Sequence, residues 1–310
     1  MAVDTYDVVV VGDYCLDLIF TGLPKMPELG VEIVSKGFEM IPGGPYNTAV
    51  AMHRLGIRVG WACDFGSDEF SRYVLAETKK EGLDDRLFRQ NACPLRNITV
   101  SLSYPTDRAF IAFYDLSPAI PAVIKALPGI STRYLYIPGI YTGPALDAGS
   151  LLLKAKRIKV IMDGNSVENA SLDNPEVRKA IQLSDIFLPN AREVRRLTGK
   201  QDLLEGIRAL ADLVPLLVVK DGRNGAYALK KGETLVYIPA LEISPVDTTG
   251  AGDCFNAGFL KAWLTGKSLE ECLKWGNIVG GLSTLELGGT GKRITEQDVY
   301  ERLSQMVGKQ

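Results

Sequence analysis

The stretch Asp247-Thr248-Thr249-Gly250-Ala251-Gly252-Asp253 stands directly before residues 254–264, whose sequence is CFNAGFLKAWL. The apolar side chains of that segment recur at helical spacing, so the sequence predicts a helix that begins near Gly250. The first N–H groups of a helix have no partner inside the helix, and the helix dipole is positive at that end. Because Gly250, Ala251 and Gly252 are small, these N–H groups stay accessible. A phosphate group fits such a position.

Asp253 lies in the first turn of this predicted helix. A carboxylate repels a bound phosphate, so its position favours a second role, that of a base for an incoming hydroxyl group. A structural alternative is that Asp253 only complements the helix dipole and that the glycines only make a tight turn. The loop taken alone leaves both interpretations open.

Together with Phe255-Asn256-Ala257-Gly258, the stretch resembles the C-terminal signature of the ribokinase family, the PfkB-type carbohydrate kinases. The segment Gly43-Gly44-Pro45-Tyr46-Asn47 resembles the paired-glycine motif of the same family, and the likeness extends over essentially the whole chain. It implies an ATP-dependent kinase that transfers the γ-phosphoryl group to a primary hydroxyl of a sugar or sugar-like molecule. In that reaction Asp253 is the base, and the N–H groups of Gly250, Ala251 and Gly252 form the anion hole.

Composition excludes several other classes of protein. The 310 residues are 46% hydrophobic, which suffices for one large or two ordinary domains, and the net charge of −2 favours neither a nucleic-acid nor a membrane partner. No apolar run approaches the ~18 residues of a membrane span, and the first residues lack the features of a signal peptide, so we expect a cytoplasmic protein. The five cysteines are widely spread, which indicates neither a disulfide framework nor a zinc site. The only histidine, His53, excludes multi-histidine metal sites within the chain.

Short apolar runs alternate with helical segments along most of the chain. Buried strands are expected at 8–11, 59–63, 134–137, 159–162, 186–188 and 216–220, and helices at 46–55, 69–80, 144–154, 191–197 and 203–213. Continuous apolar strands with helices between them favour a mainly parallel sheet covered on both faces, an α/β fold. The family resemblance makes this a single three-layer α/β/α domain over residues 1–310.

Two regions interrupt the alternation. Residues 99–103 and 110–113 are predicted as hairpin strands around the turn Pro105-Thr106-Asp107, and residues 16–35 contain no good helix. By resemblance, segments of about 14–42 and 96–116 form a small β-lid over the acceptor. The resemblance also implies a homodimer that forms through this lid.

The nucleotide side of the site is assigned by resemblance. Asn190 and Glu193 match the pair that organises Mg²⁺ and its water around the phosphates, although the same spacing is also that of a helix capping box. Lys220, Gly222 and Gly225 belong to a glycine turn against which family members place ATP, and the same turn alone indicates a plain hairpin. Asn277 matches a nucleotide contact, and the nearby Gly280-Gly281 pair serves either a flat base or close helix packing.

For the acceptor, Asp17 matches the family aspartate that binds sugar hydroxyls, and Gly43, Gly44 and Asn47 belong to the paired-glycine motif. Where the ribokinase subgroup has a sugar-binding glutamate, this chain has Pro138-Gly139-Ile140-Tyr141, so ribose is not singled out. Some relatives hold potassium beside the anion hole; the matching positions are Asp247, Thr249, Ser283, Glu286 and Gly288.

Three alternatives remain open at this stage. A nucleoside kinase of the same family would stack the base of its acceptor on Phe20, Phe110 or Phe113. A non-catalytic sugar or nucleotide sensor could use the same fold, as could an oxidoreductase with a nucleotide cofactor.

An ordinary aspartate with a pKa of ~3.9 is a weak base for an alcohol, so Asp253 is expected to orient the hydroxyl and to take its proton late.

Overall fold

The computed structural model describes residues 4–104, 108–115, 121–165 and 170–307. Its main sheet has the strand order β13-β12-β11-β10-β9-β8-β1-β4-β5. All pairs from β11 to β5 are parallel, and β12 and β13 form an antiparallel edge. The strands are β1 (Asp4–Val11), β4 (Val59–Phe65), β5 (Phe88–Gln90), β8 (Ile130–Ile137), β9 (Lys159–Asp163), β10 (Ile186–Leu188), β11 (Leu216–Lys220), β12 (Ala226–Lys230) and β13 (Val236–Ile238).

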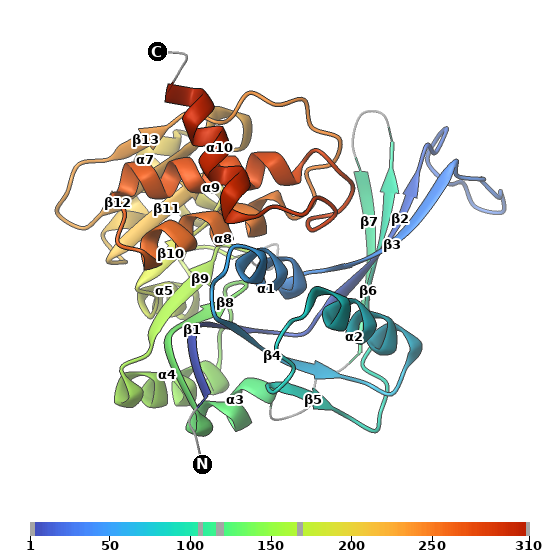
Figure 1. Cartoon of the computed structure of the whole chain (residues 1–310), viewed down its shortest axis with the longest axis horizontal. Helices are drawn as coiled ribbons and strands as arrows, with labels where there is room; N and C mark the ends of the chain where they lie inside the picture. Colours follow the sequence, from blue (N-terminus) through green and yellow to red (C-terminus); the bar gives the residue numbers. More distant parts are fainter. Residues whose placement is uncertain (1–3, 105–107, 116–120, 166–169, 308–310) are drawn as a thin grey trace.

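Helices cover both faces of this sheet (Figure 1). Alternation along β1 sends Val8 and Val10 into one hydrophobic core and Val9 and Val11 into the other. The first core lies against α1 (Pro45–Arg54), α2 (Glu69–Glu81), α8 (Ala251–Leu264), α9 (Leu269–Ser283) and α10 (Glu296–Val307). The second lies against α3 (Ala122–Ala126), α4 (Pro144–Lys156), α5 (Pro175–Gln182), α6 (Ala191–Thr198) and α7 (Leu203–Ala211). The predicted three-layer α/β/α fold is confirmed.

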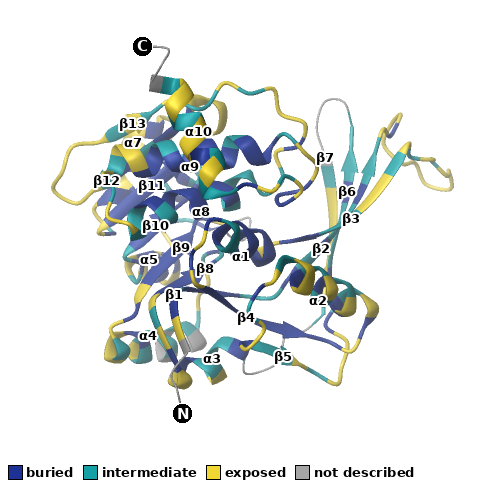
Figure 2. Cartoon of the chain, viewed as in Figure 1, coloured by how far each residue is buried: buried dark blue, intermediate teal, exposed yellow. Residues whose placement is uncertain are grey.

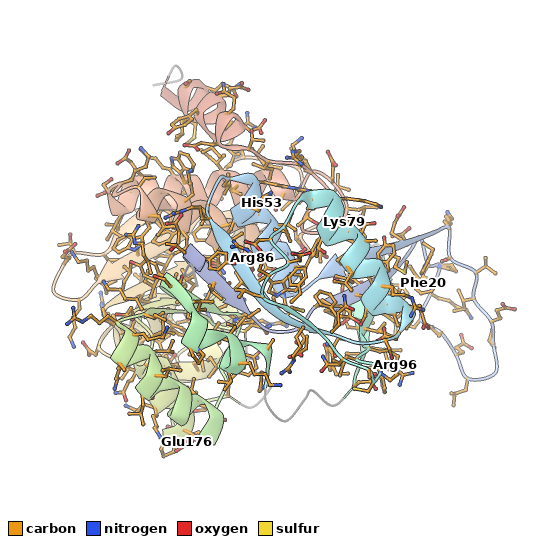
Figure 3. All side chains as sticks on the ribbon, turned by 60° about the horizontal axis from the view of Figure 1, so that its bottom comes forward. Phe20, His53, Lys79, Arg86, Arg96 and Glu176 are labelled. Atoms are coloured by element: carbon orange, nitrogen blue, oxygen red, sulfur yellow. The ribbon has the colours of Figure 1, made fainter. Side chains whose placement is uncertain are left out.

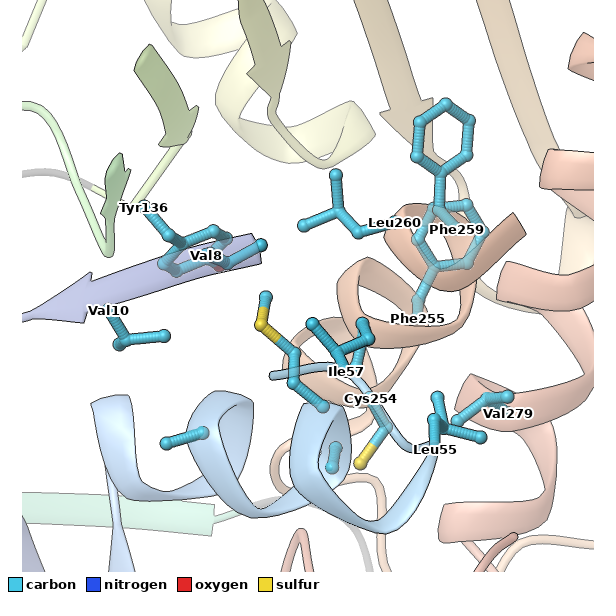
Figure 4. Packing of buried hydrophobic residues seen from close by; sticks show 14 of the residues in the cluster. Val8, Val10, Leu55, Ile57, Tyr136, Cys254, Phe255, Phe259, Leu260 and Val279 are labelled. Atoms are coloured by element: carbon cyan, nitrogen blue, oxygen red, sulfur yellow. The ribbon is translucent and has the colours of Figure 1, made fainter. Parts of the chain in front are cut away.

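The first hydrophobic core supports α1 and α8, the helices that carry residues of the site. Figure 4 shows Val8 and Val10 of β1 next to Tyr136 of β8, with α1 and α8 packed over them. Buried residues run through the main sheet and the helix sides that face it, whereas exposed residues lie on the outer sides of the helices, in the loops and along the loop between the first two strands of the second, smaller sheet (Figure 2). A well-packed core of this kind fixes the helix N-termini that face the site.

The second sheet has the order β3-β2-β6-β7 and stands beside the main one (Figure 1). Its strands are β2 (Cys15–Thr21), β3 (Gly37–Gly43), β6 (Asn97–Ser103) and β7 (Arg108–Tyr114). The predicted hairpin strands are confirmed, and the turn Pro105-Thr106-Asp107 lies outside the described residues. Figure 3 shows Phe20 on this sheet and His53, which is half-buried, on α1 of the main body.

One face of the small sheet is turned toward the main body. Asp17 and its β3 partner Ile41 lie on this face, and Ile41 contacts Gly288 of the main body. By the strand register, Ile19 and Phe110 lie on the same face as Asp17. An acceptor bound at Asp17 therefore shares its face of the sheet with Phe110.

Phe20 and Phe113 lie on the opposite face. Phe20 is an odd number of residues from Asp17, and Phe113 pairs with Ile98, which in turn pairs with Leu16. Because successive strand residues alternate between faces, neither ring can stack on a ligand held by Asp17. The expectation that these two rings contact a nucleoside base is wrong for this geometry.

The carboxyl ends of the parallel strands converge at one edge of the main sheet. Asp163 ends β9, Lys220 ends β11, and Asn190 directly follows Pro189 after β10. In open α/β sheets this edge is where ligands bind. Among the described residues, no helix is long and apolar enough to cross a membrane.

Candidate active site

The loop that ends at Asp253 forms the N-terminus of α8. Gly250 is the N-cap with φ 69°, and no side chain caps the helix. A Cβ at Gly250 would collide with Gly289 and would lie 2.9 Å from Asn47 Nδ2. Both the left-handed backbone and the close approach therefore require glycine here. The first-turn N–H groups of Gly252 and Asp253 are open to a ligand from the cleft, which both residues line.

Asp253 is half-buried at the end of that cleft. Its Oδ1 accepts a hydrogen bond from Thr48 Oγ1 at 3.1 Å, and its Oδ2 accepts one from Asn47 Nδ2 at 3.4 Å. Removal from water, reinforced by the negative charge of Asp163, raises the pKa of Asp253 to about 7, although the Lys220 ammonium and the two hydrogen bonds act in the opposite direction. The expectation of an ordinary aspartate with a pKa of ~3.9 is therefore wrong, and near neutral pH this group can both take and release a proton.

Lys220 is the cation whose charge opposes the rise in the pKa of Asp253. Its Nζ donates to Asp163 Oδ2 at 2.7 Å and to Asn256 Oδ1 at 3.2 Å, and it lies 3.7 Å from where a Cβ on Gly252 would be. The pair is nearly buried, with 11% of each side chain exposed. It places one positive charge beside the mouth of α8.

A cleft of about 640 Å³ leads away from Asp253, within the usual size range for small-molecule sites. It is lined by the predicted Asn190, Lys220, Gly222, Gly225, Gly250, Ala251, Gly252, Asp253 and Asn277. One wall is apolar, with Leu241, Ile243 and Phe255, and Asp163, Asn165 and Arg223 add polar groups. The structure thus brings the predicted nucleotide and transfer residues into one cavity.

Residues at the far end of the cleft both pack neighbouring elements together and line the cavity. Asn277 Nδ2 donates to the carbonyls of Ile238 and Pro239 at 3.1 and 2.9 Å, so this amide fastens the end of β13 to α9. A Cβ on Gly280 would press on Ala251 and Phe255, whereas one on Gly281 would meet Ile243 of the apolar wall. Both glycines line the cavity, and Gly280 also allows α9 to pack closely against α8.

Asn190 and Glu193 form a complete capping box at the start of α6. Asn190 Oδ1 accepts from the Glu193 N–H at 2.9 Å, and Glu193 Oε2 accepts from the Asn190 N–H at 2.7 Å. Burial, helped by the nearby Asp163 carboxylate, raises the pKa of Glu193. The structural alternative for this pair is confirmed; Asn190 lines the cleft, while Glu193 lies behind it.

Asp17, Gly43, Gly44 and Asn47 lie on the other side of Asp253. A Cβ on Gly43 would collide with the Asp17 carboxylate, and Gly44, with φ 63°, precedes α1. Burial raises the pKa of Asp17 to about 6 against the effect of the Cys15 thiol, and the Asp247 charge adds to the rise. Asn47 is 3% exposed, and its Oδ1 has no partner among the described residues. A buried acceptor atom without a partner is a place where a ligand hydroxyl can donate.

The loop before Gly250 is held by Asp247. Its Oδ1 accepts from the N–H and the hydroxyl of Thr249 at 3.0 and 2.8 Å, and its Oδ2 accepts from the Gly288 N–H at 2.9 Å. Ser283 donates instead to Gly280 of its own helix at 2.8 Å. Three of the five positions matched to a potassium site, Asp247, Thr249 and Gly288, are thus joined by hydrogen bonds, and the Asp247 carboxylate already receives donors from the loop itself.

Sequence reasoning missed the polar groups behind Asp253. Thr48, Tyr136, Asp163 and Asn256 come from α1, β8, β9 and α8, and none of them belongs to a local pattern that marks a ligand site. Asn256 belongs to the family signature, which assigns it no role of its own. Its 0% exposure and its hydrogen bonds with Lys220, Tyr136 and Asp163 are visible only after folding.

Solved structures of other proteins share this fold. The ribokinase of Arabidopsis thaliana complexed with ribose and ATP matches with a TM-score of 0.80 and 22% identity, over 98% of this chain and 99% of that one. The fructokinase of Vibrio cholerae O395 bound to fructose, ADP and a calcium ion gives 0.76 and 23%, over 96% and 98%. The nucleoside kinase of Methanocaldococcus jannaschii gives 0.77 and 23%, over 97% and 99%. These likenesses concern the fold.

Sequence comparison adds the family. The ribokinase of Bacillus subtilis (strain 168) is 27% identical over 304 residues, which cover 96% of this chain and 99% of that protein. The family model described as pfkB family carbohydrate kinase matches residues 6–295. This chain therefore belongs to the pfkB family and is a carbohydrate kinase, a phosphotransferase with an alcohol group as acceptor.

Proposed function

We propose that this enzyme transfers the γ-phosphoryl group of ATP to a primary hydroxyl of a sugar or sugar-like molecule, with Asp253 as the base. The observation that carries the proposal is a carboxylate with a pKa of about 7 at the point where the cleft meets the uncapped N-terminus of α8. A base and an anion-binding site at the same point suit phosphoryl transfer.

In the proposed reaction, ATP lies along the cleft with its phosphates toward Gly250, Ala251 and Gly252. The backbone N–H groups there and the Lys220 ammonium stabilise the charge on the transferring group. Asp253 orients the acceptor hydroxyl and receives its proton as the new O–P bond forms, because the transition state of phosphoryl transfer is loose. The base of the nucleotide packs against the wall formed by Leu241 and Ile243, beside Asn277 and Gly281.

The proposal includes Mg²⁺ on the nucleotide phosphates. Asn190 lines the cleft with its amide, and Glu193 behind it would act on this hard ion through bound water, as predicted for the pair. No group of three or more acidic, histidine or cysteine side chains that could cage a metal occurs in the described part of the chain. Mg²⁺ usually keeps several waters and binds through one or two protein groups plus phosphate, so this donor set fits it. When bound, the ion would neutralise charge on the β- and γ-phosphates.

The acceptor is proposed to lie between Asp253 and the small sheet. Asp17 accepts hydrogen bonds from its hydroxyls, the free Oδ1 of Asn47 accepts another, and Gly43 leaves room for the Asp17 carboxylate. The small sheet, residues of about 14–42 and 96–116, then acts as the lid that excludes water from the transfer. Together with the main body it forms one catalytic unit over residues 1–310.

Gly43→Ala is expected to raise the KM for the acceptor roughly tenfold, with the KM for ATP unchanged, because the new methyl group pushes the Asp17 carboxylate from its place. Gly129→Ala is the matched control, since a Cβ there meets nothing within 4 Å. Steady-state kinetics with each substrate varied in turn measures both constants. An unchanged acceptor KM in Gly43→Ala would remove Asp17 from the acceptor site.

Two further parts of the proposal concern ions and assembly. A potassium ion beside the loop would be bound mainly by carbonyl oxygens around Asp247, Thr249, Ser283 and Gly288, since the Asp247 carboxylate already holds the loop. A homodimer would form through the lid face opposite Asp17, where Ile111 and Phe113 are 64% and 51% exposed. We place the enzyme in the cytoplasm, where its five free thiols stay reduced.

A nucleoside acceptor is the second candidate. Phe110 lies on the same face of the small sheet as Asp17, is 62% exposed, and could cover a base. A panel of sugars, sugar phosphates and nucleosides, assayed for ADP formation in potassium and in sodium buffers, tests both candidates. Turnover with a sugar supports the first, turnover with nucleosides alone supports the second, and none with any acceptor would contradict both.

A further inference from the structure

Lys220, at the end of β11, is held by two side chains from other elements. Its Nζ donates to Asp163 Oδ2 at 2.7 Å and to Asn256 Oδ1 at 3.2 Å. Asn256 Nδ2 donates to the same Asp163 oxygen at 2.6 Å, so the three side chains form a triangle of hydrogen bonds. Lys220 and Asp163 line the cleft, whereas Asn256 is 0% exposed and lies behind it. Asn256 can therefore act on a bound ligand only through its neighbours.

The triangle fixes the direction in which the ammonium group points. An ammonium group can only donate, so the Asn256 oxygen faces Lys220, and its NH₂ group faces Asp163 and the Tyr136 hydroxyl, to which it donates at 2.8 Å. The ammonium has three N–H donors, and the triangle uses two of them. Because these three bonds are arranged tetrahedrally, fixing two of them fixes the third. The third N–H is available to a ligand in the cleft, which Lys220 lines.

One helix sets the distance between this cation and the base. Asp253 and Asn256 lie three residues apart at the start of α8, so they form one rigid unit. A Cβ on Gly252, in the same turn, would lie 3.7 Å from Lys220 Nζ. The ammonium group is therefore held beside the N-terminus of α8, on the helix that also carries the base.

We propose that Asn256 and Asp163 are positioning residues for phosphoryl transfer, which aim the third N–H of Lys220 at the phosphoryl group that is transferred at the N-terminus of α8. The inference rests on the proposed function, which places the ATP phosphates there. A positive charge attracts phosphate from several directions, whereas a hydrogen bond to the transferring group requires a defined angle. Loss of Asn256 should therefore slow the transfer and leave most of the attraction for ATP.

The first test is Asn256→Leu, which removes the amide at nearly constant volume. We expect kcat to fall about 10- to 100-fold, the usual effect of losing a hydrogen bond to a charged group, and the Kd for ATP to stay within about threefold, because the Lys220 charge remains. The kcat is taken on the plateau of each pH profile, where Asp253 is ionised, and calorimetry gives the Kd. A kcat within about threefold of wild type, or equal losses of kcat and ATP affinity, would overturn the inference.

The second test is a charge swap, Asp163→Asn together with Asn256→Asp, which preserves the shapes and the net charge. Each single change leaves Lys220 between two amides or between two carboxylates, and each should lower kcat at least about tenfold. The double variant again gives Lys220 one carboxylate and one amide, so its kcat should exceed that of either single variant by about tenfold. A double variant no faster than the single ones would contradict the role of the triangle, even if Asn256→Leu does not fold.

The matched control is Asn91→Leu. Asn91 Nδ2 donates to Asp64 Oδ1 at 2.9 Å, and Asp64 is 1% exposed and also pairs with Arg89. This group has the same chemistry as the triangle but lies outside the lining of the cleft. The substitution should lower the unfolding temperature about as much as Asn256→Leu does, with kcat unchanged. Equal losses of kcat in the two variants would reduce the effect to lost stability and overturn the inference. The proposed function would stand in that case, since it fails only if wild type transfers no phosphoryl group or if Asp253→Asn remains active.

Discussion

Asp253→Asn is expected to lower kcat by about 10² to 10⁴, the usual contribution of a general base, while ATP still binds. The amide keeps the shape of the side chain and can still accept from Thr48, so the loss reports the proton acceptor rather than the packing. The kcat with the best acceptor measures the loss of activity, and calorimetry measures whether ATP still binds. Turnover within a few-fold of wild type would show that Asp253 is not the base.

Stability should change in the opposite direction to activity. The folded-state pKa of Asp253, about 7, is above the ~3.9 of an unfolded aspartate, so its ionisation costs folding free energy as the pH rises from ~4 to ~7. A neutral amide removes that cost, and the unfolding temperature of Asp253→Asn at pH ~8 should equal or exceed that of wild type. Asp202→Asn is the matched control: Asp202 caps α7 through the Glu205 N–H at 2.9 Å, and asparagine caps equally well. It should change neither activity nor stability.

Lys220→Met is expected to have the largest effect on stability, a loss of about 3 kcal/mol of unfolding free energy, because it leaves the buried Asp163 carboxylate without its cation. It should also weaken ATP binding and move the acid limb of kcat to higher pH, since the Lys220 charge holds the pKa of Asp253 down. Urea unfolding and the kcat–pH profile measure the two effects.

Lys230→Met is the control for this prediction. Its partner Glu233 and Lys230 itself are about half exposed, so the same substitution should cost no more than ~0.5 kcal/mol. Adding Asp163→Asn to Lys220→Met removes the stranded charge and should restore part of the stability but not ATP binding. If the double variant were no more stable than Lys220→Met, charge imbalance would not be the cause of the loss.

The sequence was sufficient to predict the helices and strands and the loop before α8 at the edge of the site. Apolar runs such as residues 216–220 and the loop before α8 are local signals, and the elements they predicted formed within a few residues of the expected bounds. Asn190 and Glu193 show the limit of local reasoning, because the capping box and the metal pair have the same spacing. The family match sets aside the sensor and oxidoreductase alternatives, which the pattern of residues alone left open.

The features that could not be predicted from the sequence arise from contacts between segments that lie far apart in the chain. The pKa of Asp253 depends on Asp163, 90 residues away in the chain, and on burial that only the packed core creates. The orientation of Phe20 and Phe113 away from Asp17 depends on strand register, where a shift of one residue reverses the faces. Neither fact has a signal in the local order of residues.

The most direct test of Asp253 as the base is the pH dependence of the first turnover, measured by rapid quench with saturating ATP and acceptor. Because this rate excludes product release, its acid limb reports the proton acceptor in the bound complex. We predict a limb with an apparent pKa of about 7 in wild type, and its absence from the residual activity of Asp253→Asn. A rate that stays constant down to pH ~5, or a limb near 7 that persists in Asp253→Asn, would contradict the assignment of Asp253 as the base.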